Sequence, residues 1–165
     1  MMQTERLVLR ELAASDFADW FKMSCSIQEP GKEPPSERFE RGLFQHYLDH
    51  QRRFGYSMYA VTLKSTGQFI GSCGLEHYEW DGFPEVEIAY DLNREFWGQG
   101  YGTEAAAAVR DFAFGELGLQ RIVSYIVPDN IASRRVAEKI GLSETKPFMK
   151  DGRLHIVYAL DSRGT

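Results

Sequence analysis

A glycine-rich stretch in the middle of the chain has the residue types needed to bind a ligand. Residues 97–104 have the sequence WGQGYGTE, with glycine at every second position. Glycine has no Cβ atom, so such a backbone can turn tightly and can point several N–H groups at one place. If a helix follows directly, its N-terminus adds about half a positive charge there. The stretch therefore predicts a phosphate-binding turn.

Two other phosphate-binding motifs do not fit this stretch. A P-loop needs Gly-Lys followed by Ser or Thr, which is absent, and in the dinucleotide fingerprint the third glycine comes one residue later. Asp129 could still imitate the acidic residue that binds a ribose, which keeps a nicotinamide-dependent enzyme as an alternative. A tight connection that binds nothing would also explain the glycines.

Hydrophobic periodicity places the stretch between a strand and a helix. Residues 85–92 alternate between acidic and apolar side chains, which predicts a strand. From about Thr103 to Leu117 apolar residues recur at helical spacing, and Ile122 to Val127 is an apolar run typical of a buried strand. A strand, a helix and a second strand in this order predict a parallel crossover.

The rest of the chain predicts antiparallel strands and three further helices. Further strands are expected at residues 7–9, 59–63 and 69–75 and in a hairpin over residues 144–160, with turns at residues 65–67, 81–82 and 151–152. Ser15-Asp16 is expected to cap a short helix, and Ser36 begins a longer helix that ends at Gly55. Asn130 is expected to cap a last helix that ends at Gly141.

Length and charge limit the classes of fold and function. The 165 residues predict one domain over residues 1–165, of mixed α/β class, with a mostly antiparallel sheet of about seven strands flanked by about four helices. The net charge of −5, from 19 basic and 24 acidic residues, argues against nucleic acid as a partner. We expect a cytoplasmic protein without membrane contact, because no apolar run approaches ~20 residues and no signal peptide is apparent.

The cysteines and histidines offer little chemistry. Cys25 and Cys73 are expected to be separate buried thiols, since a small disulfide-stabilised protein would have more cysteines. His46 and His50 are four residues apart and could face one metal ion, but there is no HExxH motif and no third ligand suggests itself. A solvent-exposed helix face explains the two histidines better, so no metal is predicted.

Several motifs at matching spacing resemble one family. Gln99-Gly100-Tyr101-Gly102, then Asn130 and Ser133, and then Glu138-Lys139-Ile140-Gly141-Leu142 resemble the GNAT superfamily of acetyl-CoA-dependent N-acetyltransferases. The opening residues 4–10 and residues 96–100 resemble the branch of ribosomal-protein N-terminal acetyltransferases. The likeness covers essentially the whole chain. One departure is Trp97, where the superfamily usually has Gln or Arg.

The resemblance implies acetyl-CoA as the cosubstrate and no metal. Backbone N–H groups of residues 99–103 would hold the CoA pyrophosphate, and Asn130 would hydrogen-bond the pantetheine arm or the acetyl end. Asn130 could equally be a plain helix cap. The strand ending at Leu92 is expected to diverge from the next strand and leave an edge for pantetheine. The implied cofactor-binding residues are Leu92, Gly98, Gln99, Gly100, Tyr101, Gly102, Thr103 and Asn130.

Acetyl transfer to an amine needs a neutral nitrogen, although the pKa is ~10.4 for a lysine amine and ~7.7 to 8.0 for an N-terminal amine. Glu85, Glu87 and Asp91 share one face of the strand at residues 85–92, which suits a cationic amine. Glu87 lies mid-strand, where related enzymes often have a carboxylate, and is the candidate catalytic base, directly or through water. A solvent-exposed acidic strand face is the alternative.

The charges formed in the reaction also need partners. Backbone N–H groups near Leu92 and Asn93 could stabilise the charge that develops on the thioester oxygen. Many superfamily members protonate the leaving thiolate with a tyrosine seven residues after the asparagine matching Asn130, but here that position is Ala137. Ser133 is the candidate acid, because the ribosomal branch offers a serine in that role. A packing role for Ser133, or a thiolate that leaves unprotonated, are the alternatives.

The sequence thus predicts an N-acetyltransferase that moves the acetyl group of acetyl-CoA to a primary amine. The acceptor would be a small cationic molecule or a protein N-terminus, and nothing in the early helices indicates which. The competing hypothesis is a CoA-binding sensor without catalysis, which the missing tyrosine supports. A homodimer is left open, because similar proteins often dimerise.

Overall fold

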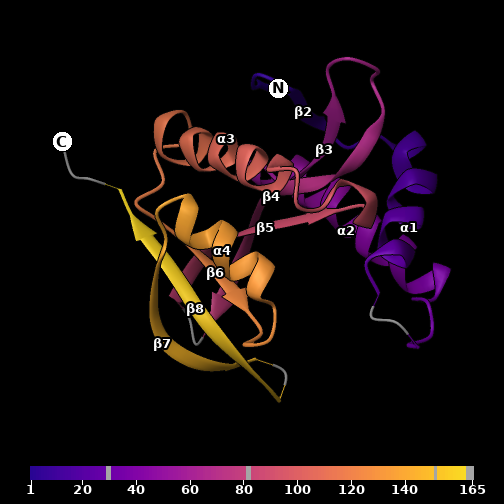
Figure 1. Cartoon of the computed structure of the whole chain (residues 1–165). Coiled ribbons are helices and arrows are strands. Elements are labelled where there is room, and N and C mark those ends of the chain that lie inside the picture. The colour runs from indigo at the N-terminus through magenta and orange to yellow at the C-terminus, as the bar shows by residue number, and fades with distance from the viewer. Residues whose placement is uncertain (29–30, 81–82, 151, 163–165) are drawn as a thin grey trace.

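One mixed sheet organises the molecule, as the computed structural model shows for residues 1–28, 31–80, 83–150 and 152–162 (Figure 1). The strands follow the spatial order β1-β2-β3-β4-β5-β6-β8-β7, and every neighbouring pair except β5 and β6 is antiparallel. Their bounds are β1 Met2–Gln3, β2 Leu7–Glu11, β3 Met58–Leu63, β4 Phe69–Trp80, β5 Phe83–Leu92, β6 Arg121–Ile126, β7 Ser143–Lys150 and β8 Arg153–Asp161.

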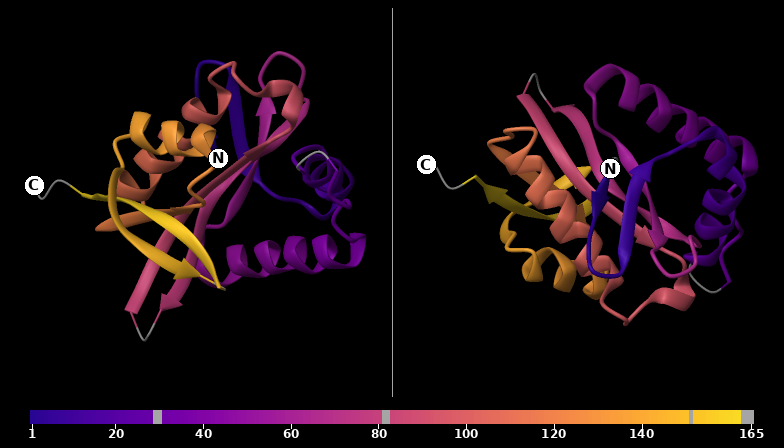
Figure 2. Two further views of the ribbon diagram at one scale, coloured as in Figure 1. Left: turned by 60° about the horizontal axis from the view of Figure 1, so that its bottom comes forward. Right: turned by 90° about the horizontal axis from the view of Figure 1, so that it is seen from above.

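Four α-helices cover the two faces of this sheet, two on each face (Figure 2). Their bounds are α1 Phe17–Ser26, α2 Glu37–Phe54, α3 Tyr101–Gly115 and α4 Ile131–Lys139. Helices α1 and α2 lie on one face, and α3 and α4 lie on the other. The predicted mixed, mostly antiparallel fold is confirmed. The described strands number eight rather than about seven, because β1 has two residues and is too short to show alternation.

Each face of the sheet has its own core. On the α3 face, Leu75 and Ile88 of the sheet are fully buried in one cluster with Ala105, Val109 and Ala113 of α3. On the α1 and α2 face, a smaller cluster contains Trp20, Met23, Phe44, Ala60 and Phe69. Side chains alternate along a strand, so each strand residue faces one of these two cores.

The ends of the helices follow local sequence signals in most cases. The Ser36 hydroxyl accepts a hydrogen bond from the Phe39 N–H at 3.2 Å, and Gly55 ends α2 with a φ of 78°. The prediction for Ser15-Asp16 was wrong in its detail, since no side-chain capping bond forms at Asp16. The Asp16 carboxylate instead accepts hydrogen bonds from Arg10 and from the Ala13 N–H. Burial opposes ionisation, but these bonds hold the pKa of Asp16 below its usual value.

The predicted turns have mixed outcomes. The turn at residues 65–67 is confirmed, with Gly67 at a φ of 73°. The predicted turn at residues 81–82, and residue 151 of the hairpin turn, lie outside the described residues. None of the described helices is long and apolar enough to cross a membrane.

The parallel pair β5 and β6 diverges soon after it forms, as predicted. The registered pairing between them is Glu87 with Val123, whereas β6 pairs with β8 along its whole length. Between Glu87 and Leu92, the edge of β5 on the β6 side therefore has no paired strand among the described residues, whereas the other edge stays paired with β4. The unpaired edge opens toward the N-termini of α3 and α4.

The close approach of β3 and β4 makes Gly74 a sensitive position. A Cβ atom at Gly74 would lie 2.2 Å from the Ser57 carbonyl oxygen and 2.5 Å from the Met58 Cα. We predict that Gly74→Ala lowers the free energy of unfolding by about 1–3 kcal/mol in urea denaturation.

The matched control is Gly42→Ala on the exposed side of α2. A Cβ atom there would meet nothing within 4 Å. Alanine is the better helix former, so this variant should gain about 0.5–1 kcal/mol. Equal stability of the two variants would contradict the packing described for Gly74.

Candidate active site

The glycine-rich stretch forms a turn that ends in the first residues of α3. A short 3₁₀ turn, Arg94–Phe96, follows β5, and α3 begins at Tyr101, two residues before the predicted start. Gly98 and Gly100 have φ angles of 75° and 84°, a region that side chains with a Cβ rarely occupy. The glycines at 98 and 100 are therefore required by the backbone path.

Five consecutive main-chain amides in this turn have no internal acceptor. The Glu104 N–H donates to the Gly100 carbonyl at 3.0 Å and starts the helical ladder. Within the described residues, no carbonyl or side chain accepts from the N–H groups of residues 99–103. These groups lie at the positive end of a helix, where an anion is stabilised. The turn can therefore bind a phosphate through its main chain.

A cavity of about 470 Å³ adjoins this turn, between the end of β5 and the start of α4. Of the residues predicted to bind a cofactor, six line it: Leu92, Gly98, Gly100, Gly102, Thr103 and Asn130. Gln99 and Tyr101 are not among its lining residues. The Gln99 side chain donates to the Glu95 carbonyl at 2.9 Å, and the Tyr101 ring lies against the Arg6 guanidinium.

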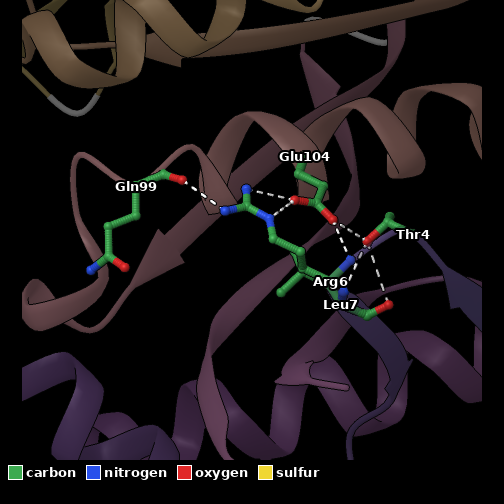
Figure 3. Close-up of polar contacts among 5 residues, drawn as sticks. All are labelled: Thr4, Arg6, Leu7, Gln99 and Glu104. Atoms are coloured by element: carbon green, nitrogen blue, oxygen red, sulfur yellow. Dashed lines mark hydrogen bonds and ion pairs between the residues drawn. The ribbon is translucent and has the colours of Figure 1, made fainter. Parts of the chain in front are cut away.

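The N-terminal segment holds the turn from outside (Figure 3). The Glu104 carboxylate accepts hydrogen bonds from the Thr4 hydroxyl, from the Arg6 N–H and from the Arg6 side chain. Arg6 also donates to the Gln99 carbonyl at 3.1 Å, as Figure 3 shows. One guanidinium therefore ties the turn to the first residues of α3 and to the start of β2.

The start of α4 forms the opposite wall of the cavity. The Asn130 side chain accepts from the Ser133 N–H at 3.1 Å, which confirms the helix-cap alternative, and Asn130 also lines the cavity. Ser133 lines the cavity as well, and its carbonyl accepts from the Tyr90 hydroxyl at 2.8 Å. Ala137, at the position of the family tyrosine, is fully buried.

Sequence reasoning missed two cationic residues in this wall. Arg135 and Lys139 line the cavity from α4. Their spacing of four residues, on a helix already predicted to start at Asn130, would have placed both on one face. It also missed that the Trp97 indole donates to the Leu92 carbonyl at 2.7 Å, which fixes Trp97 at the end of β5.

The acidic residues of β5 lie on the α1 and α2 face of the sheet, in two different surroundings. Glu87 stands opposite Glu76 of β4 and accepts from the Tyr125 N–H at 3.3 Å. It is not among the residues that line the cavity. Asp91 does line the cavity. The Asn93 N–H, predicted as an oxyanion donor, instead donates to the Ile70 carbonyl at 2.8 Å.

Asp91 is exposed to solvent and borders the cavity. Loss of hydration, together with the negative charge of Glu40, raises the pKa of Asp91 to about 6. An acidic group with this pKa can exchange a proton near neutral pH. Its neighbour in sequence, Leu92, is the end of the exposed β5 edge.

The Glu104 contacts predict a pH-dependent effect on stability. Burial opposes ionisation, but hydrogen bonds from Thr4 and Arg6 hold the pKa of Glu104 below its usual value. The stabilisation is therefore complete above the unfolded pKa and is lost as the pH falls through the lower folded pKa. We predict that Glu104→Gln lowers the free energy of unfolding by about 1 kcal/mol at pH 7.

This difference between Glu104→Gln and the wild type should disappear in acid, as measured by thermal unfolding across pH. The control Glu37→Gln removes an exposed ion pair with Arg41 and should change stability by less than about 0.5 kcal/mol. A pH-independent loss in Glu104→Gln would show that its charge is not what holds the turn.

Comparison with known proteins places this geometry in a family. The chain matches the family model described as "Acetyltransferase (GNAT) domain" over residues 6–143. It is 30% identical over 158 residues to the uncharacterized N-acetyltransferase p20 of Bacillus licheniformis, covering 93% of this chain and 84% of that protein. It is 37% identical over 109 residues to the uncharacterized protein YkkB of Bacillus subtilis, covering 66% of this chain and 63% of YkkB.

Solved structures give the same result. An acetyltransferase from Agrobacterium tumefaciens str. C58 has a TM-score of 0.84 and 36% identity, covering 98% of this chain and 94% of that one. The ribosomal L7/L12 alpha-N-protein acetyltransferase RimL has a TM-score of 0.78 at 19% identity, covering 96% and 95%, which is a likeness of fold. The chain belongs to the GNAT acetyltransferase family.

Proposed function

We propose that the protein moves the acetyl group of acetyl-CoA to a primary amine, either at a protein N-terminus or in a small cationic molecule. The observation that carries the proposal is the row of unpaired amides at residues 99–103 beside the cavity. The family's use of acetyl-CoA gives these amides a diphosphate to bind.

The residues around the cavity fit the parts of acetyl-CoA. The amides of residues 99–103 would hold the pyrophosphate, and the free edge of β5 near Leu92 would pair with the pantetheine amides. Arg135 and Lys139 add positive charge on the α4 side, where further phosphate oxygens can be bound. Bound this way, the thioester would lie deep between β5 and β6.

The acceptor amine would approach from the face of the sheet covered by α1 and α2. Glu76, Glu87 and Asp91 give this face negative charge, which suits an ammonium group. Two β5 carboxylates can serve as the base: Glu87, the residue predicted from the sequence, and Asp91. Ser133 remains the proposed donor to the leaving thiolate, and it lines the cavity from α4.

A protein N-terminus is supported as an acceptor by the names of structural relatives. One is a putative ribosomal-protein-serine acetyltransferase from Vibrio cholerae, and another is a ribosomal-protein-S5-alanine acetyltransferase from Vibrio fischeri. Their identities to this chain, 22% and 21%, show a common fold. An N-terminal peptide therefore belongs in any acceptor panel for this protein.

The cationic wall gives a direct prediction for CoA binding. We predict that the double variant Arg135→Gln and Lys139→Gln weakens CoA binding roughly tenfold or more in isothermal titration calorimetry. Added salt should weaken CoA binding by this variant less than it weakens CoA binding by the wild type. The control Arg52→Gln alters an exposed cation of α2 that pairs with Asp49 and should leave CoA affinity unchanged. Unchanged affinity in the double variant would remove α4 from the CoA site.

The test of the proposed function measures thiol release from acetyl-CoA over a panel of amines. The panel contains alaninamide, peptides that begin with serine or alanine, a polyamine and an aminoglycoside. We expect saturable, amine-dependent thiol release with at least one of them. CoA binding without release for any amine would contradict acetyl transfer and would support the CoA-binding sensor.

A further inference from the structure

Asp91 occupies the junction between the cavity and the α1 and α2 face of the sheet. It lines the cavity together with Tyr90, Leu92 and Ser133. In the β4–β5 ladder it stands opposite Ser72, and Ser72 in turn stands opposite Ala60, which belongs to the core beneath α1 and α2. The Asp91 side chain therefore lies on the α1 and α2 face, and the residue borders the cavity.

Two polar groups at this junction lack partners. The Asp91 carboxylate forms no hydrogen bond or ion pair with any described residue. Directly across the ladder, the Ser72 side chain is fully buried and its hydroxyl has no partner either within the described chain. A buried hydroxyl is seldom left unpaired, so Ser72 is available to hydrogen-bond a group that enters this junction.

The charge of a second carboxylate, Glu40 of α2, acts on Asp91. Glu40 is buried, and its only partners in the described structure are neutral donors, the Trp20 indole at 2.8 Å and the Ser24 hydroxyl at 2.8 Å. No Lys or Arg of the described residues pairs with Glu40 or Asp91. Two nearby acidic groups without a cation favour binding of a cationic ligand or of a proton.

The other titratable groups around Asp91 are neutral at physiological pH. They are Tyr47 of α2, Cys73 of β4 and Tyr90 of β5. Burial raises the pKa of each, and the negative charge of Asp91 adds to the effect. The cavity also has Arg135 and Lys139 on its α4 wall, and neither contributes to the pKa of Asp91. Glu40 is therefore the charged side chain whose field adds to the effect of lost hydration on the pKa of Asp91.

We infer that Asp91, which borders the cavity from the face of β5 beneath α1 and α2, takes the proton of the acceptor ammonium. The inference rests on the proposed function and concerns this face of the same site. The ammonium transfers one proton to the Asp91 carboxylate, and the neutral nitrogen attacks the thioester carbonyl carbon. The N–C bond forms, the C–S bond breaks, and the second nitrogen proton leaves with the thiol. Asp91 then releases its proton to solvent through the cavity.

This assignment also selects a class of acceptor. A base with a pKa of about 6 lies roughly two units below an N-terminal α-amine and more than four below a lysine-type amine. The equilibrium constant for proton transfer to Asp91 is therefore more than a hundredfold larger for an α-amine than for a lysine-type amine. We expect alaninamide to be acetylated with a higher kcat/KM than butylamine at pH 7.

The experiment combines a titration with kinetics. Carboxyl ¹³C NMR of the protein with CoA should show an aspartate midpoint near pH 6 that is missing in Asp91→Asn. The midpoint should fall by at least half a pH unit in Glu40→Gln and stay constant in the control Glu37→Gln. With alaninamide, Asp91→Asn should lose at least about 100-fold in kcat/KM while the KM for acetyl-CoA changes less than threefold.

Glu40→Gln should move the acid limb of the pH–rate profile to lower pH and leave the alkaline plateau intact. Glu87→Gln should lose less activity than Asp91→Asn. The assignment is wrong if Asp91 titrates below pH 4.5, if Asp91→Asn keeps more than a tenth of the activity, or if Glu87→Gln shows the large loss. Absence of turnover by the wild type over the whole amine panel would instead contradict acetyl transfer itself.

Stability gives an independent readout that does not need an acceptor. Because the folded pKa of Asp91 is raised, its ionised form costs stability above about pH 6, and this cost fades as the pH falls toward the unfolded value. Asp91→Asn should therefore unfold at a higher temperature than the wild type at pH 8 and at the same temperature near pH 4. A lower unfolding temperature at pH 8 would contradict a raised pKa.

Discussion

The unpaired main-chain amides of residues 99–103 are the feature on which the other parts of the site depend. They exist because α3 begins without an N-terminal side-chain cap and because two glycines with positive φ bring the chain to that point. An uncapped helix start is unfavourable unless an acceptor is supplied. The hydrogen bonds from Arg6 and Thr4 to Glu104 hold the turn in place while leaving these amides free for a ligand.

The divergence of β5 from β6 provides the second constraint, because it opens the sheet where acetyl-CoA and the acceptor amine would meet. One face of β5 packs on α3, and the other presents carboxylates beneath α1 and α2. A ligand bound at the α3 turn can therefore reach the acidic face near Asp91, because both line the same cavity. The position of one aspartate follows from the sheet geometry and not from a local motif.

Much of this arrangement could be predicted from the sequence, because local signals determine it. Glycines at 98 and 100, the caps at Ser36 and Asn130, and the period of β5 all have short-range causes. The contacts that join distant segments could not be predicted. The contact of Arg6 with Glu104 joins segments 98 residues apart, and the charge of Glu40 acts on Asp91 because α2 packs on the sheet. The alternation of β5 put Glu87 and Asp91 on one face, but only the three-dimensional fold distinguishes their surroundings.

The central claim is that main-chain amides at the start of α3 bind the diphosphate of CoA. Amide ¹H–¹⁵N NMR of the wild-type protein, titrated with CoA, tests this most directly. The account predicts saturable shifts that are largest for residues 99–103 and extend along the end of β5. Shifts confined to other parts of the molecule, or no change at millimolar CoA, would contradict it.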